Sequence, residues 1–217
     1  MDLLHPKITG YLDELAARLD EPVLLEMEEY AAKNDFPIVG RLCGMFLQTM
    51  ASAIGAQRIF EMGSGYGFSA YWFSRATGPT GEIHLTDTDP ENRTRALEYL
   101  GRAGLDAPIE YHVGDAFSVF DSTEGDFDIV YCDIDKGDYP RAWEKAKKRI
   151  RPGGLFMCDN MLWGGRVTGD PGARDEVKPG WTEAIMATNE AVFSDPDYIS
   201  FINPTRDGVV AALRTSR

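Results

Sequence analysis

The chain has 217 residues, of which 43% are hydrophobic and 26% charged, and this length fits one compact domain with a sizeable core. Its 22 Lys and Arg are outnumbered by 35 Asp and Glu, which gives a formal net charge of −13. Such a charge disfavours a nucleic-acid partner held by phosphate contacts, and it repels anionic membranes. A small-molecule substrate is therefore the better expectation.

The three cysteines are far apart in the chain and form no C-x-x-C pair: Cys43, Cys132 and Cys158. This pattern predicts neither a disulfide framework nor a zinc site, and it suits a reducing cytoplasm. The first residues are acidic and lack the basic leader and apolar run of a secretory signal. No stretch is long and apolar enough to span a bilayer, so a cytoplasmic protein without membrane segments is expected.

The first part of the chain has apolar residues at helical spacing. Helices are predicted over Ile8–Leu19, Pro22–Ala32 and Val39–Ile54, and Asp35-Phe36-Pro37 breaks the pattern between the last two. Residues 1–56 are therefore interpreted as a helical cover.

From residue 57 onward, short apolar runs alternate with amphipathic stretches, which predicts βαβ units and a parallel sheet. The predicted strands are 58–62, 82–87, 109–114, 127–135 and 153–160, and the predicted helices between them are 68–76, 90–104 and 139–150. A loop over 161–180, a helix over 182–193 and strands over 198–202 and 208–213 follow. The prediction is a single α/β domain over residues 1–217, with residues 57–217 as its core.

Ligands of parallel α/β sheets bind at the carboxyl ends of the strands, and a glycine turn follows the first predicted strand. Gly63–Gly67 carries three glycines, but the third glycine position of a dinucleotide fingerprint is Phe68, which favours a nucleoside ligand other than NAD. Asp87 ends the second strand and can accept both ribose hydroxyls, while Asp115 ends the third and can accept an adenine amino group. The alternative is that the glycines only make a tight turn and the carboxylates cap helices.

Oxygen ligands collect at the ends of two further strands: Asp133, Asp159 and Asn160. These side chains suit a hard cation, Mg²⁺, Mn²⁺ or Ca²⁺, and the alternative is that they are helix caps and a turn residue. The histidines show no ligand spacing that would favour zinc: His5, His84 and His112. The preceding residues, Cys132 and Cys158, should point to the opposite face of the sheet as core thiols.

Lys136 lies three residues after Asp133, within reach of anything that the cation holds. Neighbouring positive charge and partial burial are expected to lower its pKa, as a general base requires. The alternative is a solvated lysine at a helix start.

Five runs of sequence carry a resemblance to a known family: FEMGSGYGFSAYWFSRA, TDTDPEN, GDA, DIVYCDIDKGDY and RPGGLFMCDNMLWGGRV. Together they resemble the cation-dependent O-methyltransferases typified by catechol and caffeoyl-CoA methyltransferases, most closely the small bacterial branch. The resemblance extends from Phe36-Pro37-Ile38-Val39 to Arg206-Asp207-Gly208-Val209. It implies a Rossmann-like class I S-adenosylmethionine-dependent methyltransferase fold, with seven mostly parallel strands, the last one antiparallel, helices on both faces and a homodimer.

The resemblance also implies residue roles. The S-adenosylmethionine pocket falls on Val39, Glu61, Gly63, Ser69, Asp87, Asp115, Ala116 and Asp133. The metal ligands match Asp133, Asp159 and Asn160, and the catalytic pair matches Asp133 with Lys136 as base. Substrate or metal-loop contacts fall on Tyr139, Trp163 and Arg166.

The expected reaction is methylation of a hydroxyl on a small catechol-like or vicinal-diol aromatic substrate. The loop Gly164–Trp181 differs among family members and is expected to set specificity, with Trp163 and Trp181 as candidate ring-stacking walls. Two alternatives remain: a tRNA hydroxyuridine as acceptor, and a non-catalytic or NAD-binding α/β protein.

Overall fold

The structure is a computed structural model that describes residues 5–19, 21–169 and 178–215. It falls into two compact units: an N-terminal unit, Pro6–Ser122, and a C-terminal unit, Thr123–Arg217 together with Met1–His5. No helix among the described residues is long and apolar enough to cross a membrane.

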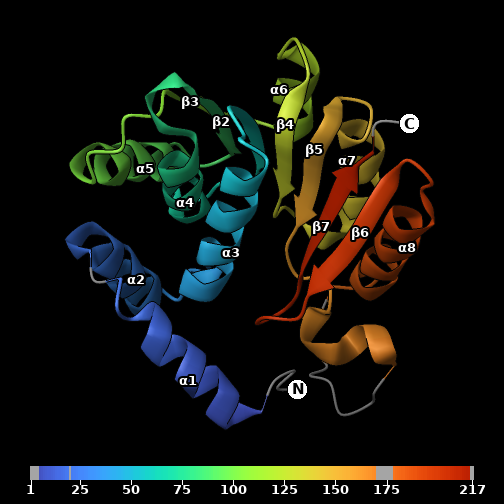
Figure 1. Cartoon of the computed structure of the whole chain (residues 1–217), viewed down its shortest axis with the longest axis horizontal. Coiled ribbons are helices and arrows are strands. Elements are labelled where there is room, and N and C mark those ends of the chain that lie inside the picture. Colours follow the sequence, from blue (N-terminus) through green and yellow to red (C-terminus); the bar gives the residue numbers. More distant parts are fainter. Residues whose placement is uncertain (1–4, 20, 170–177, 216–217) are drawn as a thin grey trace. The chain divides into compact units, whose positions relative to one another are not determined.

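The N-terminal unit begins with three helices, α1 (Pro6–Ala16), α2 (Pro22–Asn34) and α3 (Gly40–Ala53) (Figure 1). The three predicted helices are thereby confirmed, although α1 ends three residues before the predicted Leu19. Helix α2 starts on a proline and ends at Asp35, whose left-handed backbone (φ 50°) lets its N–H donate to the carbonyl of Ala31. The predicted breaker thus acts as a helix cap.

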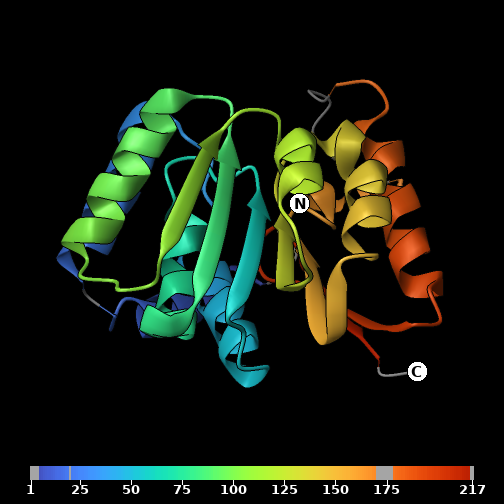
Figure 2. The same cartoon turned by 90° about the horizontal axis from the view of Figure 1, so that it is seen from above.

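Three parallel strands complete the N-terminal unit in the order β3-β2-β1: β1 (Arg58–Met62), β2 (Glu82–Asp87) and β3 (Ile109–Val113). Their helices are α4 (Phe68–Thr77), α5 (Pro90–Arg102) and α6 (Ala116–Ser122), visible around the strands in Figure 2. Glu61 faces α4, where Ser69 donates to it, whereas the ring of Phe60 packs 4.9 Å from that of Phe120 on α6. Helices therefore cover both faces of these strands, and α6 is an element that the sequence pattern did not predict.

The C-terminal unit holds four strands in the order β4-β5-β7-β6: β4 (Phe127–Cys132), β5 (Ile150–Cys158), β6 (Tyr198–Asn203) and β7 (Val209–Arg214). β4 and β5 are parallel, whereas β7 runs antiparallel to both of its neighbours. Trp143 joins helix α7 (Tyr139–Ala146) to the sheet, with its ring 5.1 Å from that of Phe156 and 4.8 Å from that of Tyr198.

Helix α8 (Trp181–Ser194) packs beside α7 (Figure 1). The loop predicted over 161–180 contains a 3₁₀ turn, Trp163–Thr168, and its residues 170–177 lie outside the described residues.

Cys132 and Cys158 are buried, as predicted for core thiols.

Glu21 ties α2 to α4, because its carboxylate accepts a 2.7 Å hydrogen bond from the Tyr71 hydroxyl and pairs with the Arg75 guanidinium. These partners hold the pKa of Glu21 below its usual value. The stabilisation is therefore present above the carboxyl's unfolded pKa and is lost as the pH falls through its folded pKa.

We expect Glu21→Gln to lower the free energy of unfolding by about 0.5–1 kcal/mol at pH 7 and to have a smaller effect at pH 3. Urea unfolding at both pH values measures this difference. Glu29→Gln, at an exposed position of the same helix, is the matched control and should leave the midpoint unchanged at either pH. A Glu21 effect of equal size at pH 3 would show that the carboxylate charge is not its cause.

Candidate functional site

The glycine turn between β1 and α4 needs glycine for conformation and for space. Gly63, Gly65 and Gly67 all have left-handed backbones, with φ of 82°, 48° and 86°. A Cβ on Gly65 would lie 3.0 Å from the ring of Phe36, and one on Gly67 would lie 3.0 Å from the Cβ of Ala96. The turn therefore presents bare backbone, which a ligand can approach closely.

Asp87 lies at the end of β2 beside this turn and is held by three N–H donors. Its Oδ2 accepts from the backbone N–H of Gly65 at 3.1 Å, and its Oδ1 accepts from the N–H of Asp89 at 2.8 Å and from the Asn92 side chain at 3.1 Å. These bonds orient the carboxylate, whose oxygens can also accept hydrogen bonds from vicinal hydroxyls.

Glu61 and Ser69 lie on the same side of the strands as α4 and are both buried. The Ser69 hydroxyl donates to the Glu61 carboxylate two residues before the turn begins. Val39 is buried just before α3, in the segment that continues from Phe36. The structure therefore brings Glu61, Ser69 and the glycine turn together.

Asp115 follows β3, and its Oδ1 accepts from the N–H and the hydroxyl of Ser118, both at 2.8 Å. It therefore caps α6, which begins at Ala116. The N–H of Gly114 donates to the Asp87 carbonyl at 2.9 Å, so the ends of β2 and β3 lie side by side.

The oxygen cluster of the C-terminal unit lies at the ends of β4 and β5. Cys132 pairs with Cys158 in the parallel register, and the N–H of Asp159 donates to the Cys132 carbonyl at 3.1 Å, so Asp133 and Asp159 leave neighbouring strands. Burial, with the nearby charge of Asp133, raises the pKa of Asp159 to about 7. A buried carboxylate beside a second one is costly to ionise unless positive charge compensates it.

Asn160 is oriented by two side chains. Its backbone is left-handed (φ 60°), the hydroxyl of Tyr139 donates to its Oδ1 at 3.4 Å, and its Nδ2 donates to Asp207 at 3.2 Å. Asp207 also accepts from the backbone N–H of Gly164, so it connects the start of the 3₁₀ turn to the oxygen cluster. The sequence pattern did not assign a role to Asp207. The one sequence feature that could have pointed to it was the Asp-Gly pair before the final strand.

Lys136 differs from its predicted state. Its side chain is only 12% exposed, so it is not the solvated lysine of the alternative interpretation, and its Nζ donates to Asp133 at 2.9 Å and to the Ile134 carbonyl at 3.2 Å. Burial lowers the pKa of Lys136, but the Asp133 carboxylate, together with the nearby Cys158 and Asp159, raises it, and the net shift is upward. The predicted downward shift is wrong for this state, because the contacting charge is negative.

The aromatic residues of the predicted substrate wall lie together. The rings of Trp163 and Trp181 are 5.9 Å apart, and the guanidinium of Arg166 lies 5.2 Å from the Trp163 ring while donating to the Trp163 carbonyl at 3.0 Å. The buried Nε1 of Trp163 has no hydrogen-bond partner among the described residues. Arg166 thus supports Trp163 directly.

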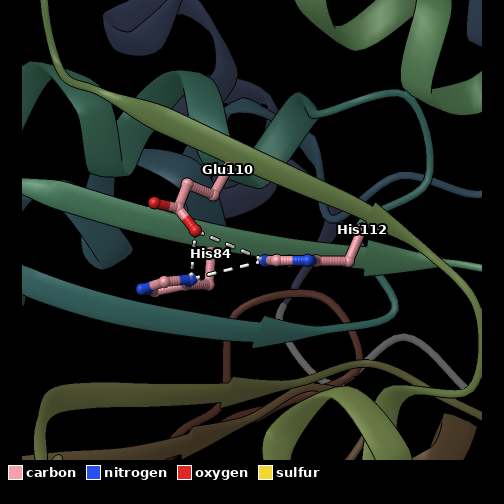
Figure 3. A group of neighbouring side chains, drawn as sticks. All are labelled: His84, Glu110 and His112. Atoms are coloured by element: carbon pink, nitrogen blue, oxygen red, sulfur yellow. Dashed lines mark hydrogen bonds and ion pairs between the residues drawn. The ribbon is translucent and has the colours of Figure 1, made fainter. Parts of the chain in front are cut away.

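The expectation that the histidines lack ligand spacing is wrong. His84 and His112 lie together with Glu110 in the N-terminal unit, with one ligand atom of each within 4.8 Å of the others (Figure 3). The sequence separation hid this cluster, because the parallel register of β2 and β3 brings the three side chains together.

A glycine turn beside a strand-end carboxylate is how α/β proteins of the nucleoside-binding class hold a ribose. Comparison with known proteins defines the family. A sequence model described as O-methyltransferase matches residues 13–215, and the chain therefore belongs to the O-methyltransferase family. This confirms the family that the sequence motifs resemble.

Individual relatives support this family assignment. The chain is 30% identical over 199 residues to a maize caffeoyl-CoA O-methyltransferase, covering 87% of this chain and 75% of the relative. It is 29% identical over 195 residues to a catechol O-methyltransferase of Niastella koreensis, covering 87% and 88% of the two chains.

Solved structures match over almost the whole chain. The O-methyltransferase TomG from Streptomyces achromogenes, determined in complex with S-adenosylmethionine, is 27% identical with a TM-score of 0.79, covering 97% of this chain and 96% of that one. A methyltransferase from Geobacter sulfurreducens is 26% identical with a TM-score of 0.81, covering 98% of both chains. These matches confirm the predicted fold of seven mostly parallel strands with surrounding helices.

Proposed function

We propose that this protein transfers the methyl group of S-adenosylmethionine to a hydroxyl of a small catechol-like or vicinal-diol aromatic substrate, assisted by a divalent cation. Family membership and the catechol and caffeoyl-CoA relatives support the reaction class. The observation that carries the cation-dependent form is Asp159, a buried carboxylate beside Asp133 whose pKa is raised to about 7.

S-adenosylmethionine supplies an electrophilic methyl group on a sulfonium sulfur. Its proposed contacts are Val39, Glu61, Gly63, Ser69, Asp87, Asp115, Ala116 and Asp133. Asp87 fits the ribose, because three N–H donors already orient its carboxylate. The glycine turn fits a close ligand, because bare backbone leaves room where side chains would obstruct it. The complex of TomG with S-adenosylmethionine supports this assignment.

The side chains of Asp133, Asp159 and Asn160 would hold the divalent cation, and their all-oxygen donor set fits Mg²⁺, Mn²⁺ or Ca²⁺. When bound, the cation supplies positive charge that favours the ionised form of a hydroxyl. Tyr139 and Asp207 hold the Asn160 amide in one orientation from opposite ends.

Lys136 is the proposed base, with Nζ as the atom that accepts the hydroxyl proton. In this structure Nζ is a charged donor to Asp133, so it must first release a proton to solvent before it can accept one from the substrate hydroxyl, and this release would become easier once another group engages the Asp133 charge. Its burial then favours the neutral amine. The rings of Trp163 and Trp181 offer apolar faces for an aromatic acceptor, and Arg166 supports the first of them.

We expect Asp87→Ala to weaken S-adenosylmethionine binding by roughly 10- to 100-fold, because hydrogen bonds to a charged group contribute about 1.5–3 kcal/mol. Isothermal titration calorimetry with S-adenosylmethionine, S-adenosylhomocysteine and NAD measures this effect and the nucleoside preference together. Asp106→Asn, at an exposed position of the same unit, is the control and should bind like the parent. Tight NAD binding, or no nucleoside binding at all, would contradict the proposal.

Two predictions about organisation remain proposals. The family match runs through both units, which supports a single domain over residues 1–217. The homodimer is an expectation from the family resemblance that sedimentation equilibrium would test.

A tRNA hydroxyuridine stays the alternative acceptor, and the net charge of −13 disfavours it.

A further inference from the structure

A cluster of imidazole and carboxylate groups lies on β2 and β3, formed by residues that the proposed reaction does not use. His84 pairs with Glu110 in the parallel register, and His112 lies two residues further along β3. Since side chains two apart share a face of a sheet, all three project from the same side (Figure 3). This is the side of Phe60, whose ring stacks on that of His84 at 6.1 Å, and not the side of Glu61 and Ser69.

The three facing atoms form a nearly regular triangle. The Nδ1 of His84 lies 3.4 Å from the Nε2 of His112 and 3.4 Å from the Oε2 of Glu110, and the last two atoms are 3.8 Å apart. Tetrahedral zinc with bonds of about 2.0–2.2 Å holds its ligand atoms roughly 3.3–3.6 Å apart. Shifts of a few tenths of an ångström would therefore bring the triangle to zinc geometry.

The hydrogen bonding around His84 orients the ring toward this triangle. Its Nε2 contacts the Glu82 carboxylate, which also pairs with Arg58 at 3.3 Å. A proton on Nε2 donates to that carboxylate and leaves the lone pair of Nδ1 facing His112 and Glu110. A carboxylate on the outer nitrogen is the usual support of a metal-binding histidine, because it fixes the tautomer and the ring orientation.

With that tautomer, two acceptors face each other across 3.4 Å, the Nδ1 of His84 and the carboxylate of Glu110. A cation bound between them would be coordinated by both atoms.

The cluster is also accessible. His84 is buried, but the side chains of Glu110 and His112 are 58% and 34% exposed, and β3 lies at the end of the strand order. An ion can therefore enter from solvent, and water can fill a fourth ligand position.

We propose that His84, Glu110 and His112 form a second metal site, selective for Zn²⁺ or a divalent transition metal of similar ligand preference. Two imidazoles and one carboxylate suit such ions and not Mg²⁺ or Ca²⁺. The site would bind β3 to β2 and stabilise the N-terminal unit. It does not depend on the proposed methyl transfer, because it shares no residue with the proposed cofactor or cation sites.

The test uses the full chain, freed of any affinity tag and dialysed against chelator, in buffer with excess Mg²⁺ to occupy oxygen-ligand sites. Competition with a chromogenic zinc indicator gives affinity and stoichiometry, and Co²⁺ absorption reports nitrogen ligation. The variants are His112→Gln and Glu110→Gln, both at solvent-accessible positions, with His5→Gln as the matched histidine control and Asp159→Asn as the control for the oxygen cluster.

We expect one Zn²⁺ per chain, weakened at least about 10-fold in His112→Gln and Glu110→Gln and unchanged in the two controls. Zn²⁺ should also raise the melting temperature of the parent but not of His112→Gln. Equal Zn²⁺ affinity in the parent and His112→Gln, or loss of binding in Asp159→Asn alone, would overturn the proposal. Either result would leave His84, Glu110 and His112 as a hydrogen-bonded link between strands.

Discussion

Lys136→Met is expected to lower kcat for methyl transfer by about 100- to 10,000-fold, the usual contribution of a positioned general base. The Kd for S-adenosylmethionine should change far less than kcat, because Lys136 contacts only one of the proposed cofactor contacts, Asp133, besides the Ile134 carbonyl. Single-turnover kinetics with saturating cofactor, combined with calorimetry, separates the two quantities.

The matched control is Lys148→Met, a lysine at an exposed position of the same unit, which should retain full activity. A Lys136→Met enzyme with normal turnover and weakened cofactor binding would contradict the assigned role. A base should also show in the pH profile, because the variant loses the rate increase that accompanies deprotonation of Nζ.

Asp159→Asn is expected to reduce cation-dependent transfer by about 100-fold or more, because it removes one of two carboxylates from the proposed cation site. The decline should include a weaker apparent affinity for Mg²⁺ in activity titrations. Asp197→Asn, an exposed acidic position of the same unit, is the control and should show neither effect. Unchanged Mg²⁺ dependence in Asp159→Asn would remove this residue from the proposed site.

Asp159→Asn should lower activity but raise the free energy of unfolding at alkaline pH. Because burial and Asp133 raise the pKa of Asp159 to about 7, its neutral form stabilises the fold below pH 4, and this contribution is lost as the pH rises through 7. In EDTA, Asp159→Asn should therefore unfold like the parent near pH 4 and be more stable at pH 8 by on the order of 2–4 kcal/mol. Urea unfolding at the two pH values measures this, and a less stable variant at pH 8 would contradict it.

The fold was largely predictable because each strand carries its own apolar run and each helix its own amphipathic pattern. The run RIFEM, the glycines after it and FSAYWFSRA predict β1, the turn and α4 without reference to the rest of the chain. Helix α6 was missed because it is short and follows β3 directly through the Asp115 cap. Such an element depends on its contact with Phe60 more than on its own periodicity.

The candidate sites were predictable where residues follow strand ends, and not where they depend on register or side-chain direction. Asp133 and Asp159 could be placed together because parallel strands end at one edge. His84 and Glu110 meet only through the pairing of β2 with β3, which no local pattern specifies. The upward shift of the Lys136 pKa in this state was not predictable, because it depends on the contact of Nζ with Asp133, which no local pattern specifies.

The central claim is cation-assisted methyl transfer to a vicinal diol, and one measurement tests it most directly. Transfer from labelled S-adenosylmethionine is followed for catechols, caffeoyl esters and their monohydroxy analogues, with Mg²⁺, with Mn²⁺ and with EDTA. The prediction is labelling of the vicinal diols alone, dependent on the added cation and lost in EDTA. Equal labelling in EDTA, or equal labelling of the monohydroxy analogues, would contradict the account.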